Sequence, residues 1–208
     1  TAATVLNSIS PEKMAIEAMG DHCNYEVSWM DSGGAEGLPA IARENPLTEE
    51  LRQELLAIDG VESITSHEVT SATVKFPQES VALKFPVFDR EQMEQWLPEE
   101  NLEQGSVDYE ELAANNGVIV TDSEDHLLSM FYGYTPAVGD VLTFESMDGK
   151  TIEVTVMGIA KPSVTSGTGA WGLFTLTEEL ADQLYPDIEN REAVWNVHTS
   201  KDSDALRA

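Results

Sequence analysis

The chain has 208 residues, of which 41% are hydrophobic and 24% charged, proportions that suit one large folded domain or two small ones. Its charge is unbalanced, because 11 Lys and Arg residues stand against 38 Asp and Glu, a formal net charge of −27. Such a chain does not neutralise nucleic-acid phosphates, and an anionic lipid surface repels it. The single cysteine, Cys23, excludes an internal disulfide and a multi-cysteine zinc site, and the cellular compartment stays open.

Membrane and targeting signals are missing from the sequence itself. No run reaches the roughly 18 apolar residues that a spanning helix needs. The first ten residues have neither the basic start nor the apolar run of a signal peptide. The chain also begins without Met, so we expect it to be an excised soluble piece of a longer protein.

The first part of the chain predicts a helix, a strand and a loop. Ser10 is a suitable N-cap, and the helix that follows is expected to end at Gly20. Apolar residues alternate with polar ones over Asn24–Met30, which predicts a strand. Three glycines and a proline favour a loop over Asp31–Asn45.

A well-marked helix and a long β-rich run follow. Thr48 is the expected cap of a helix over Glu49–Ile58, whose leucines fall on one face, and Gly60 ends it. Val61–Phe76 is rich in Val, Ile and Thr and predicts one long strand or two short ones. The first third therefore predicts a helix laid across a sheet.

The middle of the chain predicts short elements separated by turn residues. Asp89 with Gln92, and Asp108 with Glu111, have the spacing of capping boxes that begin helices. The other elements expected here are a strand over Ser80–Phe85, a strand over Val118–Thr121, and a helix from Ser123 to Gly133.

A β-hairpin is the strongest local prediction. Val141–Ser146 and Thr151–Ile159 alternate apolar and polar residues, and Asp148-Gly149 between them suits a tight turn. The last part predicts a Gly- and Ser-rich loop, a helix and a strand: a loop over Ser163–Gly172, a helix capped by Thr177, and a strand over Ala193–Thr199. The element order predicts a discontinuous α/β subdomain, 21–77 plus 174–208, interrupted by a β-rich insertion.

Candidate metal-ligating and basic residues are scattered. The histidines are isolated from one another: His22, His67, His126 and His198. The densest cluster, Asp122–His126, has two interpretations, a metal site or a helix N-terminus with acids placed to suit the dipole. We favour the helix N-terminus, because consecutive residues of a helix point in different directions.

Other catalytic and binding motifs are incomplete. Ser166–Gly169 lacks the Gly-Lys ending of a phosphate loop, and neither an EF-hand pattern nor a Gly-x-Ser-x-Gly elbow is present. Cys23 beside His22 is interpreted as a small apolar core residue, since neighbours on a strand point to opposite faces. No residue is therefore assigned to catalysis, to a cofactor or to a metal.

Aromatic residues supply candidates for contact with another protein. Met130, Phe131, Tyr132 and Tyr134 cluster before a proline, and Trp171 lies in the Gly-rich loop. Core packing is the favoured interpretation for Phe131. Trp171 is harder to bury in such a loop, and with Tyr134 and Tyr132 it forms the candidate partner contact.

Three stretches resemble the extracytoplasmic (MacB-like periplasmic core) domain of MacB-like, FtsX-like ABC transporter permeases. In Leu47–Ser63 a helix ends in a Gly-Val pair that opens the next strand. Gly117–Thr121 is a Gly-Val-Ile-Val run, and in Val138–Ala160 a Val-Gly-Asp sequence leads into the hairpin. With the start at Asn7–Met14, the similarity covers most of the chain in the expected order.

The resemblance implies an α+β fold made of a βαβ porter-type subdomain with an inserted β-rich, sabre-like lobe. Residues 1–20 are then a helical stalk leading from a removed transmembrane helix. Residues 21–77 and 174–208 form the porter-type subdomain, and 78–173 form the lobe. The middle lobe is short for the family, and the acidity is stronger than the resemblance requires.

The resemblance also implies a function without catalysis. The domain lies on the extracellular face of a cell membrane, and a separate cytoplasmic ABC ATPase subunit, reached through the missing transmembrane helices, hydrolyses ATP. The domain relays the resulting motion to export or signalling, with a second permease copy or an extracellular protein as further partner. No cofactor and no nucleic acid are implied, and an acidic surface without disulfides fits a Gram-positive outer face.

Two alternatives from other classes stay open. One is a secreted acidic binding domain, stabilised by calcium. The other is a hydrolase with dispersed carboxylates, which requires a strongly perturbed acid in a deep pocket.

Overall fold

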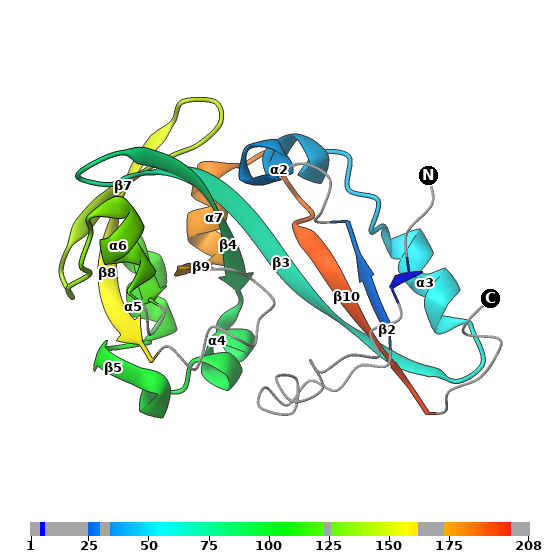
Figure 1. Ribbon diagram of the computed structural model, residues 1–208. Coiled ribbons are helices and arrows are strands. Elements are labelled where there is room, and N and C mark those ends of the chain that lie inside the picture. The colour runs from blue at the N-terminus through cyan, green and yellow to red at the C-terminus, as the bar shows by residue number, and fades with distance from the viewer. Residues whose placement is uncertain (1–4, 7–24, 30–33, 123–125, 162–172, 201–208) are drawn as a thin grey trace.

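The computed structural model describes residues 5–6, 25–29, 34–122, 126–161 and 173–200 (Figure 1). The described strands form one mixed sheet, and helices lie between them along the chain, which confirms the expected α+β class. The strands are β1 (Val5–Leu6), β2 (Tyr25–Ser28), β3 (Val61–Lys75), β4 (Ser80–Phe88), β5 (Leu102–Gly105), β6 (Gly117–Thr121), β7 (Val141–Glu145), β8 (Thr151–Ala160), β9 (Phe174–Thr177) and β10 (Glu192–Thr199). The helices are α2 (Gly34–Ala42), α3 (Glu49–Leu56), α4 (Arg90–Trp96), the 3-10 turn η2 (Glu99–Asn101), α5 (Tyr109–Ala114), α6 (Leu127–Tyr132) and α7 (Glu178–Leu184).

One part of the molecule is an open sheet in the order β1-β2-β10-β3. Both β2 and β3 run antiparallel to β10 between them, so they are parallel to each other and are connected through α2 and α3. Tyr25 and Val27 of β2 are buried and alternate with half-buried residues, which confirms the strand expected there. The strand–helix–strand order expected for the first third is therefore present as a split βαβ unit.

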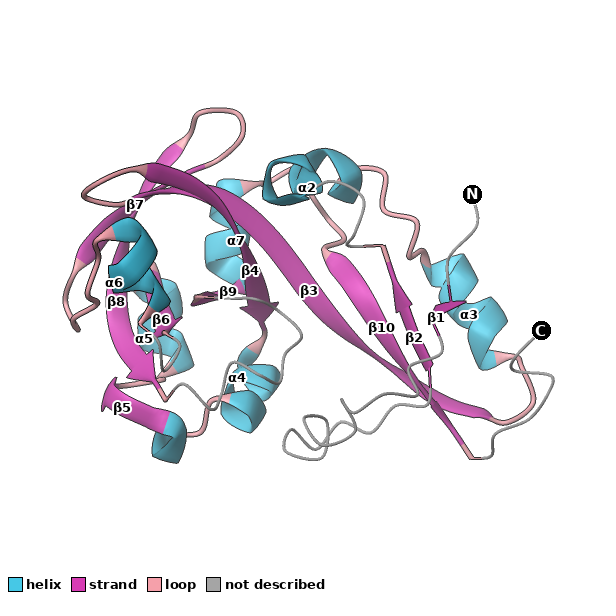
Figure 2. Cartoon of the chain, in the orientation of Figure 1, coloured by secondary structure: helices cyan, strands magenta, loops and turns pink. Residues whose placement is uncertain are grey.

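The other part is a ring of strands that closes on itself (Figure 2). Pairing runs from β3 to β4, β9, β6, β8 and β7, and β7 returns to β3. The expected hairpin forms β7 and β8, with Gly149 at a positive φ of 80° in its turn. Helices α4, α5, α6 and α7 lie around this ring in Figure 1.

Strand β3 belongs to both parts. Its residues from Val61 to Glu68 pair with β10, and its residues from Glu68 to Lys75 pair with β4. The long β-rich run is thus one strand, and Glu68 is where it passes from the open sheet into the ring. The ring also contains β9, which lies beyond the range 78–173 expected for the inserted lobe. The subdomain boundaries at 77 and 174 stay a prediction.

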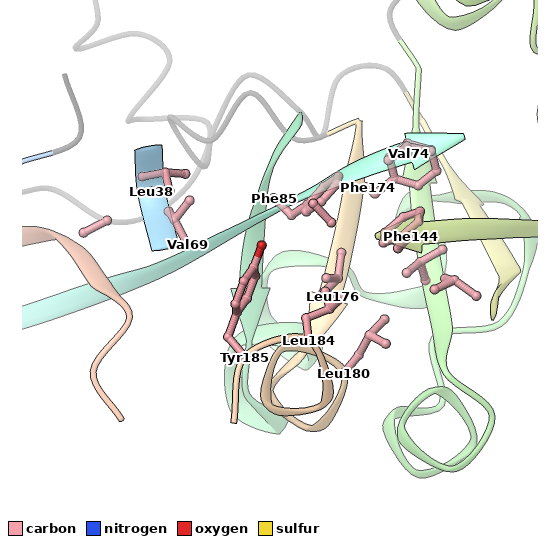
Figure 3. Close-up of a cluster of buried hydrophobic side chains, with 14 of the residues drawn as sticks. Leu38, Val69, Val74, Phe85, Phe144, Phe174, Leu176, Leu180, Leu184 and Tyr185 are labelled. Carbon is pink, nitrogen blue, oxygen red and sulfur yellow. The ribbon is translucent and has the colours of Figure 1, made fainter. Parts of the chain in front are cut away.

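Aromatic packing fills the ring (Figure 3). Phe85, Phe144 and Phe174 are fully buried, and their ring centroids lie 5.1, 5.5 and 6.0 Å apart in pairs. Leu180 and Leu184 of α7 are buried in the same hydrophobic cluster. The interior of the ring is therefore a packed core.

Helix caps follow the sequence where the cap is a side chain. The Thr48 and Thr177 hydroxyl oxygens accept from the backbone N–H groups of Leu51 and Leu180. Asp89 and Gln92 form a complete capping box at the start of α4. The Asp108 carboxylate likewise accepts from the N–H of Glu111 at the start of α5. These four helix starts are confirmed.

The loop expected over Asp31–Asn45 is wrong, because α2 occupies 34–42. Its glycines and Pro39 disfavour a helix locally. Leu38 and Ala42 are nevertheless buried where α2 packs against β3 and β4, so tertiary burial overrides the propensity. β4 likewise continues through Pro86 to Phe88, because β9 pairs only from Val87 onward and the missing N–H of proline interrupts no bond there.

The start of α6 and the burial of Phe131 also differ from expectation. The helix begins at Leu127, and the carboxylate of Asp122 accepts from the N–H of Leu128. Phe131 is 59% exposed, so the core interpretation is wrong for it, and Leu128 fills the core instead. The helix expected at 10–20, the loop at 163–172 and all of the stalk except β1 lie outside the described residues.

The aromatic core predicts a clear contrast between two phenylalanines. Replacing buried Phe144 with Ala should lower the free energy of unfolding by about 3–5 kcal/mol, because it leaves a cavity inside the ring. Replacing exposed Phe131 with Ala should change it by no more than about 0.5 kcal/mol. Urea denaturation of the 208-residue chain measures both, and equal losses would contradict the packed ring.

Candidate functional site

The predicted partner-contact residues have different surroundings. Tyr134 is 7% exposed, and its hydroxyl donates to the carboxylate of Asp140 at 2.9 Å. Burial, followed by this bond, raises the pKa of Tyr134. Tyr132 is half-buried and stacks on Phe76 with centroids 4.9 Å apart. Trp171 lies outside the described residues, and a partner contact at these positions stays a prediction.

Exposed apolar side chains lie close to them in sequence. Met130 and Phe131 of α6 are 61% and 59% exposed, and Val138 and Val141 are also exposed. In the described part of the chain, the exposed large hydrophobic residues all fall between Met130 and Met147. Exposed apolar area thus lies on α6 rather than at the buried Tyr134, and the partner contact expected at Tyr132 and Tyr134 stays a prediction.

Asp122 and His126, the described ends of the acidic cluster, lie at the start of α6. One Asp122 oxygen accepts from the Leu128 N–H, and the other lies 3.7 Å from Nδ1 of His126. His67 and His198 contact Asn196 and Thr65 at 2.9 and 3.2 Å. Among the residues that the structure describes, no three His, Cys, Asp or Glu side chains gather as metal ligands. Cys23, His22 and Ser166–Gly169 lie outside those residues.

The most unusual polar chemistry lies at the junction, which we define as residues 66–68 of β3 and the side chains packed on them. Consecutive strand residues point to opposite faces, so His67 and Glu68 face different neighbours. The ring of His67 contacts Trp96 of α4 edge-on, with centroids 6.3 Å apart. The amide of Gln92 in α4 also donates to the Ser66 carbonyl at 3.1 Å. Helix α4 of the ring is thereby fixed to β3 at this point.

Arg191 occupies the other side of the junction. Only 6% exposed, it immediately precedes β10 and donates to the carboxylate of Asp182 in α7. Its backbone oxygen accepts from Val69 of β3 at 3.0 Å. The guanidinium group therefore ties α7 to the place where β10 meets β3.

Glu68 is incompletely paired in this arrangement. Its Oε2 lies 4.0 Å from the nearer Arg191 nitrogen, too far for a hydrogen bond, and this buried oxygen has no hydrogen-bond partner. Burial raises the pKa of Glu68 to about 7, although the charge of Arg191 acts in the opposite direction. The junction thus holds a half-buried carboxyl group with one buried, unbonded oxygen and a raised pKa.

A second charged network fixes α3 to the open sheet. Glu192 accepts from Arg52 of α3 and, at 2.8 Å, from the indole of Trp195. The Arg52 guanidinium lies 4.7 Å from the ring centroid of Trp195, which is fully buried. This network is structural, because each of its charged groups has an ordinary partner.

Sequence reasoning missed the junction. Glu68 and Arg191 are charged residues within or beside apolar strands, and charged residues in such places are rarely buried without a partner. The sequence contains this signal, but it does not show which residue lies opposite Glu68. The nearest cation, Arg191, is 123 positions away in the chain. Only the pairing of β10 with β3 brings the two together.

The comparisons with known proteins gave matches among solved structures. No family model and no curated protein matches the chain. The extracellular domain of the noncanonic ABC-type transporter YknZ from Gram-positive bacteria is 18% identical, covers 79% of each chain and has a TM-score of 0.42. The periplasmic region of MacB from Actinobacillus actinomycetemcomitans is 14% identical, with coverage of 75% of this chain and 66% of that one, and a TM-score of 0.41.

Both structures are extracellular or periplasmic regions, one of a noncanonic ABC-type transporter and one of MacB. At these identities and TM-scores the likeness does not transfer a function to this chain. Within the described residues, no helix combines the length and the apolar character needed to cross a membrane.

The junction predicts that two arginines differ sharply in their contribution to stability. Replacing buried Arg191 with Met should cost about 2–4 kcal/mol of unfolding free energy, because Asp182 and Glu68 lose their cation. Replacing Arg90, which pairs with Glu110 at the surface, should cost less than about 1 kcal/mol. Urea denaturation at neutral pH compares them, and a cost for Arg191→Met as small as that for Arg90→Met would refute a structural role of the junction.

Proposed function

We propose that this chain is a non-catalytic extracytoplasmic domain of a MacB-like, FtsX-like ABC transporter permease. The observation that supports this function is the placement of the three stretches that resemble the family. The first stretch forms α3 and the start of β3, which pairs with β10 in the open sheet. The second forms β6 and the third the β7–β8 hairpin, and β8 pairs with both β6 and β7. Two stretches that are separate in the sequence thus lie side by side in the ring, and β3 continues from the first stretch into the same ring.

The arrangement of the chain supports a mechanical role. Strand β1 and the end of β10 at Thr199 both lie in the open sheet, away from the ring in Figure 1. Membrane anchors joined to these ends would deliver their motion to the open sheet first. Because β3 continues from that sheet into the ring, a displacement of one part is passed to the other through a hydrogen-bonded strand.

The partners follow from the same role. A cytoplasmic ABC ATPase subunit supplies ATP hydrolysis through transmembrane helices, and the domain itself hydrolyses nothing. A second permease copy or an extracellular protein contacts the ring near α6, where Met130 and Phe131 are exposed beside Tyr132. Trp171 stays a further candidate for this contact. We infer a cell membrane, with this domain outside, and a Gram-positive source.

The proposed location predicts labelling from outside the cell. In the full-length protein with Cys23→Ser and any other cysteines replaced, a cysteine at exposed Glu153 of β8 should react with a membrane-impermeant maleimide on intact cells. A cysteine in a cytosolic protein of the same cells is the control and should react only after lysis. Labelling of Glu153→Cys only after lysis would refute the extracytoplasmic location.

The same assay tests the partner surface. A cysteine at Phe131 should react more slowly than one at Glu153 in cells, because a partner covers α6, and equally fast once the protein is purified. Equal rates in both states would remove α6 as the contact. That result would leave the extracytoplasmic location intact, so the two parts of the function fail separately.

A further inference from the structure

We propose that Glu68 is a proton-dependent latch at the junction: α7 is held firmly in its place beside the junction when this carboxyl group is protonated, and is loosened when it is ionised. This behaviour is intrinsic to the fold and does not depend on the transporter function.

At the junction, one guanidinium group lies near two carboxyl groups. Arg191 is the cation of the junction, and its hydrogen bond goes to Asp182 of α7. Glu68 is left 4.0 Å away without a hydrogen bond to its buried Oε2, and Nε of Arg191 is also buried without one. One guanidinium group is therefore shared between two carboxyl groups, and only Asp182 is bound by it.

Further carboxylates face Glu68 from the elements packed around it. Glu178 and Asp182 face it from α7, and Glu192 faces it from β10, directly across the strand pair. Glu192 is neutralised by Arg52 of α3. The cation near the acids of α7 is Arg191, and these acids share it with Glu68, so their charge is only partly neutralised. A charge on Glu68 thus adds repulsion mainly toward α7.

The remaining ionisable groups near the junction act in the same direction or lie elsewhere. Asp89, the cap of α4, and Glu179 lie beside Glu178, and both help to raise the pKa of Glu178. His67 lies on the opposite face of β3, in contact with Asn196 and Trp96. A proton on Glu68 therefore removes one negative charge from a group of acids whose total charge Arg191 only partly neutralises.

The proton is exchanged in the neutral range. Burial, opposed by Arg191 and reinforced by the acids of α7, raises the pKa of Glu68 to about 7. A raised acid pKa means that the closed state binds the proton more tightly than an open state in which the carboxyl group meets water. The closed state consequently loses stability as pH rises from the ordinary glutamate pKa of 4.5 to about 7.

Local opening of α7 is the expected response to ionisation. The helix is only seven residues long, and Leu180, Ala181 and Leu184 hold it by burial while its remaining residues are exposed. Opening would expose Oε2 of Glu68 together with Leu180 and Leu184, while the backbone pairing between the strands of the ring does not involve α7. The latch thus adjusts how firmly the ring holds the strand that it shares with the open sheet.

Amide hydrogen exchange of the 208-residue chain tests the latch. Protection factors of the α7 amides should fall about tenfold between pH 6 and pH 8, as expected for a carboxyl group whose pKa is about 7 closed and 4.5 open. Those of the β7–β8 hairpin should stay constant, because protection factors already correct for the intrinsic effect of pH. Constant protection of α7, or an equal change in the hairpin, would overturn the proposal.

Two variants assign the effect to Glu68. Glu68→Gln keeps the shape of the protonated side chain, so its α7 protection should be high and independent of pH. Glu153→Gln, on the exposed side of β8, is the matched control and should retain the tenfold change. A Glu68→Gln chain that still shows the tenfold change would exclude Glu68 as the latch.

A direct titration makes the test independent of whether Glu68→Gln folds. The carboxyl carbon of Glu68, followed by NMR in the unsubstituted chain, should titrate with a midpoint near 7. Replacing Glu178 with Gln removes a facing acid and should move that midpoint downward. A midpoint close to that of exposed glutamates, about 4.3, would overturn the proposal.

Discussion

Pairing along the 15 residues of β3 is the constraint on which the rest of the structure depends. Backbone groups of a strand must be satisfied along its whole length, and β3 achieves this with β10 first and with β4 and β7 later. Each part of the molecule therefore contains a strand that it shares with the other. A split βαβ sheet and a closed ring therefore meet through one continuous strand.

The shared strand also explains why charged groups gather at residues 66–68. Inside the ring, Phe85, Phe144 and Phe174 exclude polar side chains, and the open sheet has its own buried residues. Between them, α4 contacts β3 through Gln92 and Trp96, Arg191 beside β3 binds α7, and the first turns of both helices are acidic. Arg191 offsets part of that charge, and Glu68 stands where the compensation is incomplete. The incompletely paired Glu68 and the passage of β3 from one part to the other thus lie at the same place in the fold.

Local signals in the sequence predicted much of this fold. Thr48, Asp89 and Thr177 cap helices because a side-chain oxygen and its backbone partner are three residues apart, and Asp148-Gly149 forms a hairpin turn for an equally local reason. Long-range packing decided what was missed. The Gly-rich segment 34–42 is helical because burial of Leu38 stabilises it there. Phe131 is exposed because Leu128 takes the core position. Glu68 lies near Arg191 only because β3 pairs with β10.

Native-state hydrogen exchange in increasing, sub-denaturing urea tests most directly whether β3 joins the two parts into one cooperative structure. The slowest amides of β10 in the open sheet and of β6 in the ring should open with the same free energy and the same dependence on urea. If β6 stays protected under conditions in which β10 has already opened, the two parts unfold separately, and the account of β3 as a rigid shared element is contradicted.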